Sequence, residues 1–276
     1  MRKLWCLAIP LIAVCAAVAL LGGLTGTWDY NLDTSAWYDG STGETVIVYA
    51  PVSFADEFTE KTVDSTNLWN VNTVNSGAAA INVVAGGTAR LTTGAADNDY
   101  VELATQLIWK AGKVCTVEAR IALNDAAHTA WAFGFSDAVS EAAGEGEGEG
   151  EGESGRRLAI TYSTTVLTST ASDFAGFFWD PDGTTDVLRA VCVKANVDGT
   201  VVSTSTVLGN GVYHIYRVDL SATGAVTYWL DGTCIGGQES GITTTSALCG
   251  YVGFMNREAS ANTLDIDYIR VWQGTR

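Results

Sequence analysis

Two stretches decide the fold: residues 54–71 read FADEFTEKTVDSTNLWNV, and residues 263–273 read TLDIDYIRVWQ. Between them lies a long series of short, Thr- and Val-rich alternating segments, separated by Gly, Asn and Asp clusters. Alternation of apolar and polar residues at this spacing is typical of strands in an all-β sandwich. We therefore expect the two stretches to lie side by side in one sheet, so that the chain leaves and returns to the same edge.

The closing stretch also predicts a local irregularity. Leu264 and Ile266 keep one phase of the alternation, but Ile269 and Val271 take the opposite phase. Because successive side chains of a strand point to opposite faces, one extra residue near Asp267 restores the pattern. We expect a β-bulge at this position.

Composition limits the class of protein and the partners. The 276 residues include 30 Gly, only three Pro and 47% hydrophobic residues, which fits a packed β protein with tight turns. A net charge of −16 repels the phosphate backbone of nucleic acids, so nucleic acid is excluded as a partner. The same charge favours hard cations such as calcium as ligands.

The chain divides into segments of different character. Residues 1–24 are an apolar segment behind Arg2 and Lys3, either a secretory signal or a retained anchor that contacts the membrane through residues 4–24. An aromatic arm and a first strand follow over residues 25–53. The β-sandwich is expected over residues 54–273, and its Gly/Glu tract at 142–156 is predicted to be a solvated loop insertion.

Four cysteines lie in the body of the chain: Cys115, Cys192, Cys234 and Cys249. They are either small buried residues on strands or members of disulfides, and four cysteines allow three pairings. If the body is exported, Cys234 and Cys249 are the first pair to test, since they flank one connection.

Several motifs resemble the concanavalin A-like lectin/glucanase superfamily. The likeness is carried by DEF at 56–58, VDSTNLW at 63–69, VYHIYRVDLSATGAVTYWLDG at 212–232 and DYIRVWQ at 267–273. This resemblance implies an all-β jelly-roll sandwich of two antiparallel sheets. It also implies a structural calcium ion between the first and last strands, with Asp56 and Asp267 at the matching positions and Glu57 beside them. The alternative is that these acids simply face water.

The resemblance also bears on catalysis. VEARIAL at 117–123 and AWAFGF at 130–135 are similar to the strand pair that precedes the active site of laminarinase-type hydrolases. Those enzymes carry Glu-x-Asp-x-x-Glu on the next strand, and this motif occurs nowhere in the chain. Asp137 and Glu141 are the nearest substitute, but they lie at a strand end that leads into the Gly/Glu loop. We therefore predict that the protein is not an enzyme.

Glycan binding by a jelly roll uses exposed aromatic rings that stack on sugars. Trp109, Trp131, Trp179 and Tyr228 are the candidates, with Trp179 favoured because it adjoins a polar loop. The alternative is that these rings are core, since each can bury a large apolar area.

The aromatic arm resembles jelly-roll proteins encoded among the structural genes of tailed bacteriophages. TWDYNLDTSAWYDG, at residues 27–40, leads into VIVYAPVSFADEF at 46–58. This likeness implies a non-catalytic, surface-displayed sandwich with a structural or adhesive role, such as a virion decoration or fibre, that can self-assemble. The alternatives are an exported, membrane-anchored bacterial glycan-binding module and a divergent glycoside hydrolase. Each reading places the protein outside the cell or on a surface, facing a glycan, a particle or a cell.

Overall fold

The computed structural model divides the chain into two units, residues 1–50 and residues 51–276. The residues that it describes are 28–31, 36–39, 45–47, 52–82, 87–140 and 158–274. The predicted apolar segment at 1–24 and the Gly/Glu insertion at 142–156 lie outside these residues. Within the described part of the chain, no helix is long and apolar enough to cross a bilayer.

The first unit contains a small antiparallel sheet within the stretch predicted as the aromatic arm. Its strands are β1 (Trp28–Asn31), β2 (Ala36–Asp39) and β3 (Thr45–Ile47), paired in that order. Tyr30 lies opposite Trp37, and Trp37 lies opposite Val46. The described residues of this unit therefore form three short antiparallel strands.

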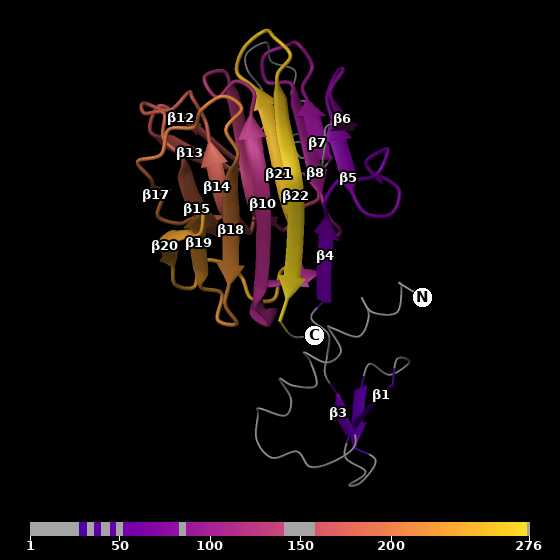
Figure 1. Ribbon diagram of the computed structural model, residues 1–276. Helices are drawn as coiled ribbons and strands as arrows, with labels where there is room; N and C mark the ends of the chain where they lie inside the picture. The colour runs from indigo at the N-terminus through magenta and orange to yellow at the C-terminus, as the bar shows by residue number, and fades with distance from the viewer. Residues whose placement is uncertain are drawn as a thin grey trace. The chain divides into compact units, whose positions relative to one another are not determined.

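The second unit is a sandwich of two antiparallel sheets (Figure 1). Sheet 1 has the order β20, β19, β18, β10, β22, β7, β6, with β4 also on β22. Its strands are β4 (Val52–Asp56), β6 (Ala78–Asn82), β7 (Thr88–Thr92), β10 (Cys115–Leu123), β18 (His214–Leu220), β19 (Val226–Leu230), β20 (Thr233–Gln238) and β22 (Thr263–Gln273).

Sheet 2 has the order β16, β15, β14, β11, β21, β8, β5, with β17 on β15 and β9 on β21. Its strands are β5 (Asn70–Thr73), β8 (Tyr100–Ala104), β9 (Trp109–Lys110), β11 (Thr129–Ser136), β14 (Phe174–Trp179), β15 (Arg189–Lys194), β16 (Val197–Asp198), β17 (Val202–Ser203) and β21 (Ala247–Asn256). A separate hairpin joins β12 (Ile160–Ser163) to β13 (Val166–Ser169), and a 3₁₀ turn, η1 (Ala111–Lys113), follows β9. The predicted all-β, two-sheet sandwich is confirmed.

The two ends of the sandwich pair with each other, as the sequence predicts. Phe54 in β4 lies opposite Val271 in β22, and Asp56 lies opposite Ile269. The first half of β22 pairs instead with β7, where Leu264 lies opposite Leu91. One edge of β22 therefore pairs with β7 over its first half and with β4, the first strand of the sandwich, over its second half.

The predicted bulge is present at the point where β22 changes partner. On β10, Arg120 lies opposite Tyr268 while the next residue, Ile121, lies opposite Ile266. Asp267 is the extra residue, and it lets apolar side chains on both halves of β22 face the core. The hairpin predicted within 212–232 is also confirmed, as β18 and β19.

The core lies between the sheets and is rich in aromatic rings. Phe177 of sheet 2 and Tyr216 of sheet 1 meet edge to face, with ring centroids 5.3 Å apart. Trp131 contacts the same tyrosine at 4.8 Å. Full burial of a large apolar side chain is worth about 1.5–3 kcal/mol, so these rings contribute strongly to holding the sheets together.

The four cysteines of the sandwich are all free thiols. Cys115, Cys192 and Cys249 are buried, and Cys234 is exposed on β20. Of the two alternatives, the structure therefore favours unpaired cysteines on strands, and the suggested pair of Cys234 and Cys249 is not formed.

Candidate functional site on the outer face of sheet 1

The four aromatic candidates for sugar stacking are all buried. The exposed fraction is 0% for Trp109 and Trp131, 1% for Tyr228 and 2% for Trp179. Trp179, the favoured candidate, donates its indole N–H to the carbonyl of Ala126 at 2.8 Å. Their side chains belong to the core cluster between the sheets, so the structure corrects the prediction that these rings face a glycan.

The outer face of sheet 2 is covered by the chain itself. Phe174 and Phe178 of β14 project there and pack with Ile160 of the β12–β13 hairpin and with Tyr251 of β21. Apolar packing therefore fills this face in the described part of the chain.

Glu102, on β8, is a fully buried carboxylate on that face. It accepts hydrogen bonds from the hydroxyl of Tyr251 at 2.7 Å, the amide of Asn72 at 2.9 Å and the hydroxyl of Ser140 at 2.9 Å. These donors offset the loss of water around the carboxylate, as a buried charge requires.

The outer face of sheet 1 carries a row of chemically diverse side chains across four strands. Trp229 of β19 lies opposite Arg217 of β18, Arg217 lies opposite Glu118 of β10, and Glu118 lies opposite Arg270 of β22. Side chains at facing positions of neighbouring strands project from the same side of a sheet, so the four form one continuous row. Inward-facing residues of the same strands belong to the core, which leaves this row on the outside.

A cavity of about 250 Å³ opens at one end of this row. We call it the sheet 1 cavity, and its walls are Glu118, Ile215, Arg217, Trp229 and Gly232. The part-buried indole provides an apolar wall, and Glu118 and Arg217 add polar groups. Ligand pockets combine apolar and aromatic walls with a few polar groups in this way.

Hydrogen bonds hold the charged side chains of the row in place. Arg217 donates to both carboxylate oxygens of Asp219, at 2.8 and 3.0 Å, and this bond raises the pKa of the guanidinium. The same guanidinium lies 5.6 Å from the ring centroid of Trp229 and 5.7 Å from that of Trp272. A cation between two indole rings gains from the electrostatic field of both faces. The polar wall of the cavity is thus pre-organised.

Glu118, the other charged residue of the cavity wall, is oriented by Tyr268. The tyrosine hydroxyl donates to the Glu118 carboxylate at 3.0 Å. Burial, followed by the charge of Glu118, raises the pKa of Tyr268 to about 12, so its hydroxyl remains a donor at neutral pH. The carboxylate therefore keeps a fixed position with further acceptor capacity for ligand hydroxyls.

The three acids predicted to bind calcium lie near the paired ends of the sandwich, and each has a partner. Asp56 accepts from the indole N–H of Trp69 at 2.8 Å. Glu57 pairs with Arg270 at 2.6 Å, and Asp267 pairs with Arg120 at 2.8 Å. They do not form a close group of three ligands among the described residues. Calcium at this edge stays a prediction.

No family model matches this chain, and no curated protein sequence matches it. Solved structures do match. The laminarinase of Rhodothermus marinus is 12% identical over 81% of this chain and 98% of its own, with a TM-score of 0.53. The β-glucanase of Bacillus licheniformis is 11% identical over 80% and 97%, with a TM-score of 0.52. The carbohydrate recognition domain of Emp47p is 12% identical over 81% and 95%, with a TM-score of 0.51.

Identities this low show the fold alone, and the shared fold is the concanavalin A-like jelly roll. The resemblance proposed from the sequence is thereby confirmed at the level of the fold. Carbohydrate recognition domains and glycan-cleaving enzymes both occur among the matching structures. None of these three proteins is described as a bacteriophage protein.

These matches correct the prediction that the protein is not an enzyme. Besides the laminarinase and the β-glucanase, they include an endo-β-1,4-glucuronan lyase and a structure described with endo-acting O-glycanases of the human gut microbiota. The prediction depended on the absence of Glu-x-Asp-x-x-Glu, which belongs to one type of hydrolase. The missing motif therefore does not exclude catalysis by this fold.

Proposed function

We propose that this protein binds a neutral glycan and that the sheet 1 cavity is its binding site. The observation that carries the proposal is the indole of Trp229 in the wall of a cavity that also presents Glu118 and Arg217. An indole supplies a flat apolar surface for the C–H face of a sugar ring, while a carboxylate and a guanidinium supply an acceptor and donors for its hydroxyls. The occurrence of carbohydrate recognition domains among structures of this fold supports the proposal.

Charge favours a neutral ligand over an acidic one. The chain carries a net charge of −16, and Glu118 is part of the cavity wall. Both features repel uronate or sulfate groups. Arg217 offsets little of this repulsion, because its guanidinium is already paired with Asp219. Hexose polymers without charged substituents are therefore the expected ligand class.

Calorimetric titration with laminarin and mixed-linkage β-glucan oligosaccharides tests this proposal. We expect binding by the wild type, and a loss of at least about tenfold in affinity for Trp229→Ala, which corresponds to about 1.4 kcal/mol. Trp272→Ala is the matched control, because it removes an indole that contacts Arg217 but does not line the cavity. An equal loss of affinity in the two variants would contradict the proposal. So would a wild type that binds glucuronan oligosaccharides but not neutral oligosaccharides.

Cleavage of the bound glycan is the second candidate function. It is favoured by the glycan-cleaving enzymes of this fold and by the position of Glu118, a carboxylate oriented by Tyr268 in the cavity wall. The titrated samples are therefore also assayed for new reducing ends. If the wild type releases them and Glu118→Gln abolishes release while retaining binding, the carboxylate is catalytic. If Glu118→Gln cleaves at the wild-type rate, the carboxylate is not required for cleavage.

The proposal also includes a location. A glycan ligand is most accessible to a protein displayed outside the cell, and the apolar residues 4–24 would export or anchor it. Display on a virion stays a prediction from the aromatic arm at 25–53. Residues 1–27 lie outside the described part of the chain.

A further inference from the structure

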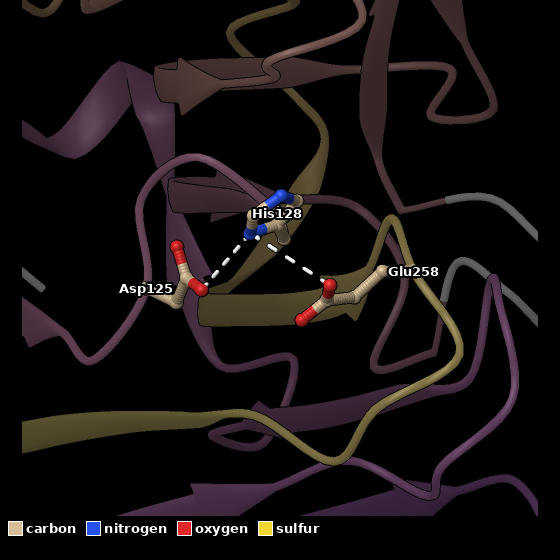
Figure 2. Close-up of side chains that lie close together, drawn as sticks. All are labelled: Asp125, His128 and Glu258. Atoms are coloured by element: carbon tan, nitrogen blue, oxygen red, sulfur yellow. Dashed lines mark hydrogen bonds and ion pairs between the residues drawn. The ribbon is translucent and has the colours of Figure 1, made fainter.

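A second group of chemically active side chains lies away from the sheet 1 cavity, in two loops at one end of the sandwich. Asp125 and His128 belong to the loop between β10 and β11, and Glu258 belongs to the loop between β21 and β22. Figure 2 shows the two carboxylates on either side of the imidazole. The Nδ1 atom of His128 lies 3.0 Å from Asp125 Oδ2 and 3.8 Å from Glu258 Oε2.

These three side chains can supply one ligand atom each to a single ion. The three atoms all lie within 4.8 Å of one another, and this is the one such group of three metal-ligating residues among those that the structure describes. About half of the His128 side chain is exposed, with 27% of Asp125 and 32% of Glu258. An ion held there would therefore keep open positions for water.

Each carboxylate is oriented by a donor on the side away from the imidazole. The backbone N–H of Ala127 donates to Asp125 Oδ1 at 3.0 Å, and the amide of Asn262 donates to Glu258 Oε1 at 3.2 Å. One oxygen of each carboxylate is thus engaged while the other faces His128. Such outer partners fix the orientation of metal ligands and tune their affinity.

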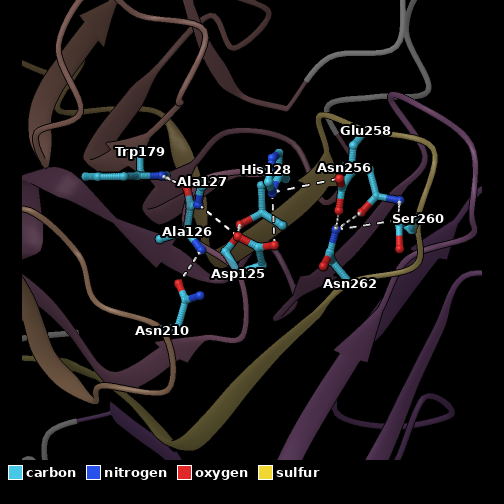
Figure 3. A network of polar contacts seen from close by, with 11 residues as sticks. Asp125, Ala126, Ala127, His128, Trp179, Asn210, Asn256, Glu258, Ser260 and Asn262 are labelled. Carbon is cyan, nitrogen blue, oxygen red and sulfur yellow. Dashed lines mark hydrogen bonds and ion pairs between the residues drawn. The ribbon is translucent and has the colours of Figure 1, made fainter.

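The loop that carries Asp125 and His128 is itself anchored to the sandwich (Figure 3). Ala126 donates its N–H to Asn210 at 2.9 Å and accepts from the indole of the buried Trp179 at 2.8 Å. The two loops are joined directly, because the N–H of Arg257 donates to the carbonyl of His128 at 2.8 Å. Hydrogen bonds therefore hold in place the backbone that carries the ligand side chains.

The second loop is anchored by a buried amide. Asn256 is fully buried and donates to the carbonyl of Ser260 at 2.6 Å. It also accepts from Asn262, the residue that orients Glu258, at 3.3 Å. Figure 3 shows how this network continues from the imidazole into the body of the protein. Both sides of the cluster are thus pre-organised, which lowers the conformational cost of binding an ion.

We propose that Asp125, His128 and Glu258 bind a divalent transition ion of the zinc class. One imidazole nitrogen with two carboxylate oxygens is a ligand set that suits Zn²⁺, whereas calcium and magnesium take oxygen ligands alone. The ion would replace the hydrogen bond between Asp125 and His128 and would link the β10–β11 loop to the β21–β22 loop. This site is separate from the predicted calcium ligands Asp56, Glu57 and Asp267.

Calorimetric titration of the full chain with zinc chloride tests this site. We expect one Zn²⁺ per chain, and His128→Ala should weaken binding by more than the 10–100-fold that loss of an outer partner costs. His214→Ala is the matched control, since His214 also contacts a carboxylate, that of Asp231 at 2.7 Å. Among the residues that the structure describes, His214 belongs to no group of three metal-ligating side chains. Equal Zn²⁺ affinity in wild type and His128→Ala, or an equal loss in both variants, would overturn the proposal.

Thermal unfolding provides a second readout that does not depend on the heat of binding. Zinc should raise the unfolding temperature of the wild type and of His214→Ala but not that of His128→Ala, because a ligand stabilises only the state that binds it. Without metal, His128→Ala should unfold near the wild-type temperature, since about half of the His128 side chain is exposed. Displacement of Zn²⁺ by equimolar Ca²⁺ would show an oxygen-only site and contradict the proposed class of ion.

Discussion

Tyr228 and Trp229 are neighbours in β19 and project to opposite faces of sheet 1. The sequence interpretation chose Tyr228 as a sugar-binding ring, whereas the structure buries it and places Trp229 in the wall of the cavity. Alternation shows that the two rings face opposite ways, but it does not show which face meets the second sheet. Because both faces of β19 carry an aromatic residue, the sequence does not show which of the two rings is exposed. Packing against sheet 2 buries Tyr228 and leaves Trp229 on the outer face.

One buried ion pair gives a sharp test of the structure at the residue scale. Asp180 is 1% exposed and accepts from Arg257 at 2.5 and 3.1 Å. Arg257→Ala would leave this carboxylate buried without its cation, so we expect a loss of about 3–5 kcal/mol in the free energy of unfolding. Urea denaturation measures the loss as a lower midpoint at an unchanged slope.

The matched control is an arginine in an exposed pair. Arg270 and Glu57 lie 2.6 Å apart, but their side chains are 46% and 50% exposed. Because solvent screens such pairs, Arg270→Ala should change the free energy of unfolding by only about 0–1 kcal/mol. Similar losses in the two variants would contradict the burial of Asp180.

The free thiols give a further test, because they differ in exposure. Cys234 is exposed, whereas burial raises the pKa of Cys115 to about 11 and also raises the pKa of Cys192. Since the thiolate is the reactive form, we expect Cys234 alone of the four to react quickly with a thiol reagent at neutral pH. Comparing the labelling rate of wild type with that of Cys234→Ala measures this, because Cys6 and Cys15 are common to both. An unchanged fast phase in the variant would be inconsistent with this arrangement.

At the scale of the elements, the closing strand was predictable in detail. The phase change between Ile266 and Ile269 predicted a bulge, and the structure places it where β22 exchanges β7 for β4 as a partner. The hairpin of β18 and β19 was also predicted, because two alternating runs flank Ala222-Thr223-Gly224. These features depend on local alternation and turn chemistry, which a sequence records directly.

The positions that depend on distant contacts were not predictable. The β12–β13 hairpin covers the outer face of sheet 2 through Ile160, a contact that no local pattern specifies. The cluster of Asp125, His128 and Glu258 joins two loops that are far apart in the sequence. No local sequence pattern marks any of the three residues as a metal ligand. The pairing of β10 with β22 and of β11 with β21 brings these loops together.

At the scale of the whole molecule, the two outer faces of the sandwich differ in chemistry. The outer face of sheet 2 is packed with apolar side chains from the same chain, while that of sheet 1 presents indoles, arginines and carboxylates around a cavity. This asymmetry explains why we place the glycan on sheet 1. The net charge of −16 then favours a ligand without acidic groups.

Nuclear magnetic resonance of the tryptophan indoles tests the glycan site most directly. The chain has nine tryptophans, and the signal absent from Trp229→Phe identifies the Trp229 indole N–H, which has no hydrogen-bond partner among the described residues. On addition of a neutral β-glucan oligosaccharide, we expect the Trp229 signal to shift with the same saturation curve as the calorimetric titration, while that of the buried Trp179 stays in place. Saturable binding that leaves the Trp229 signal unmoved would contradict the account.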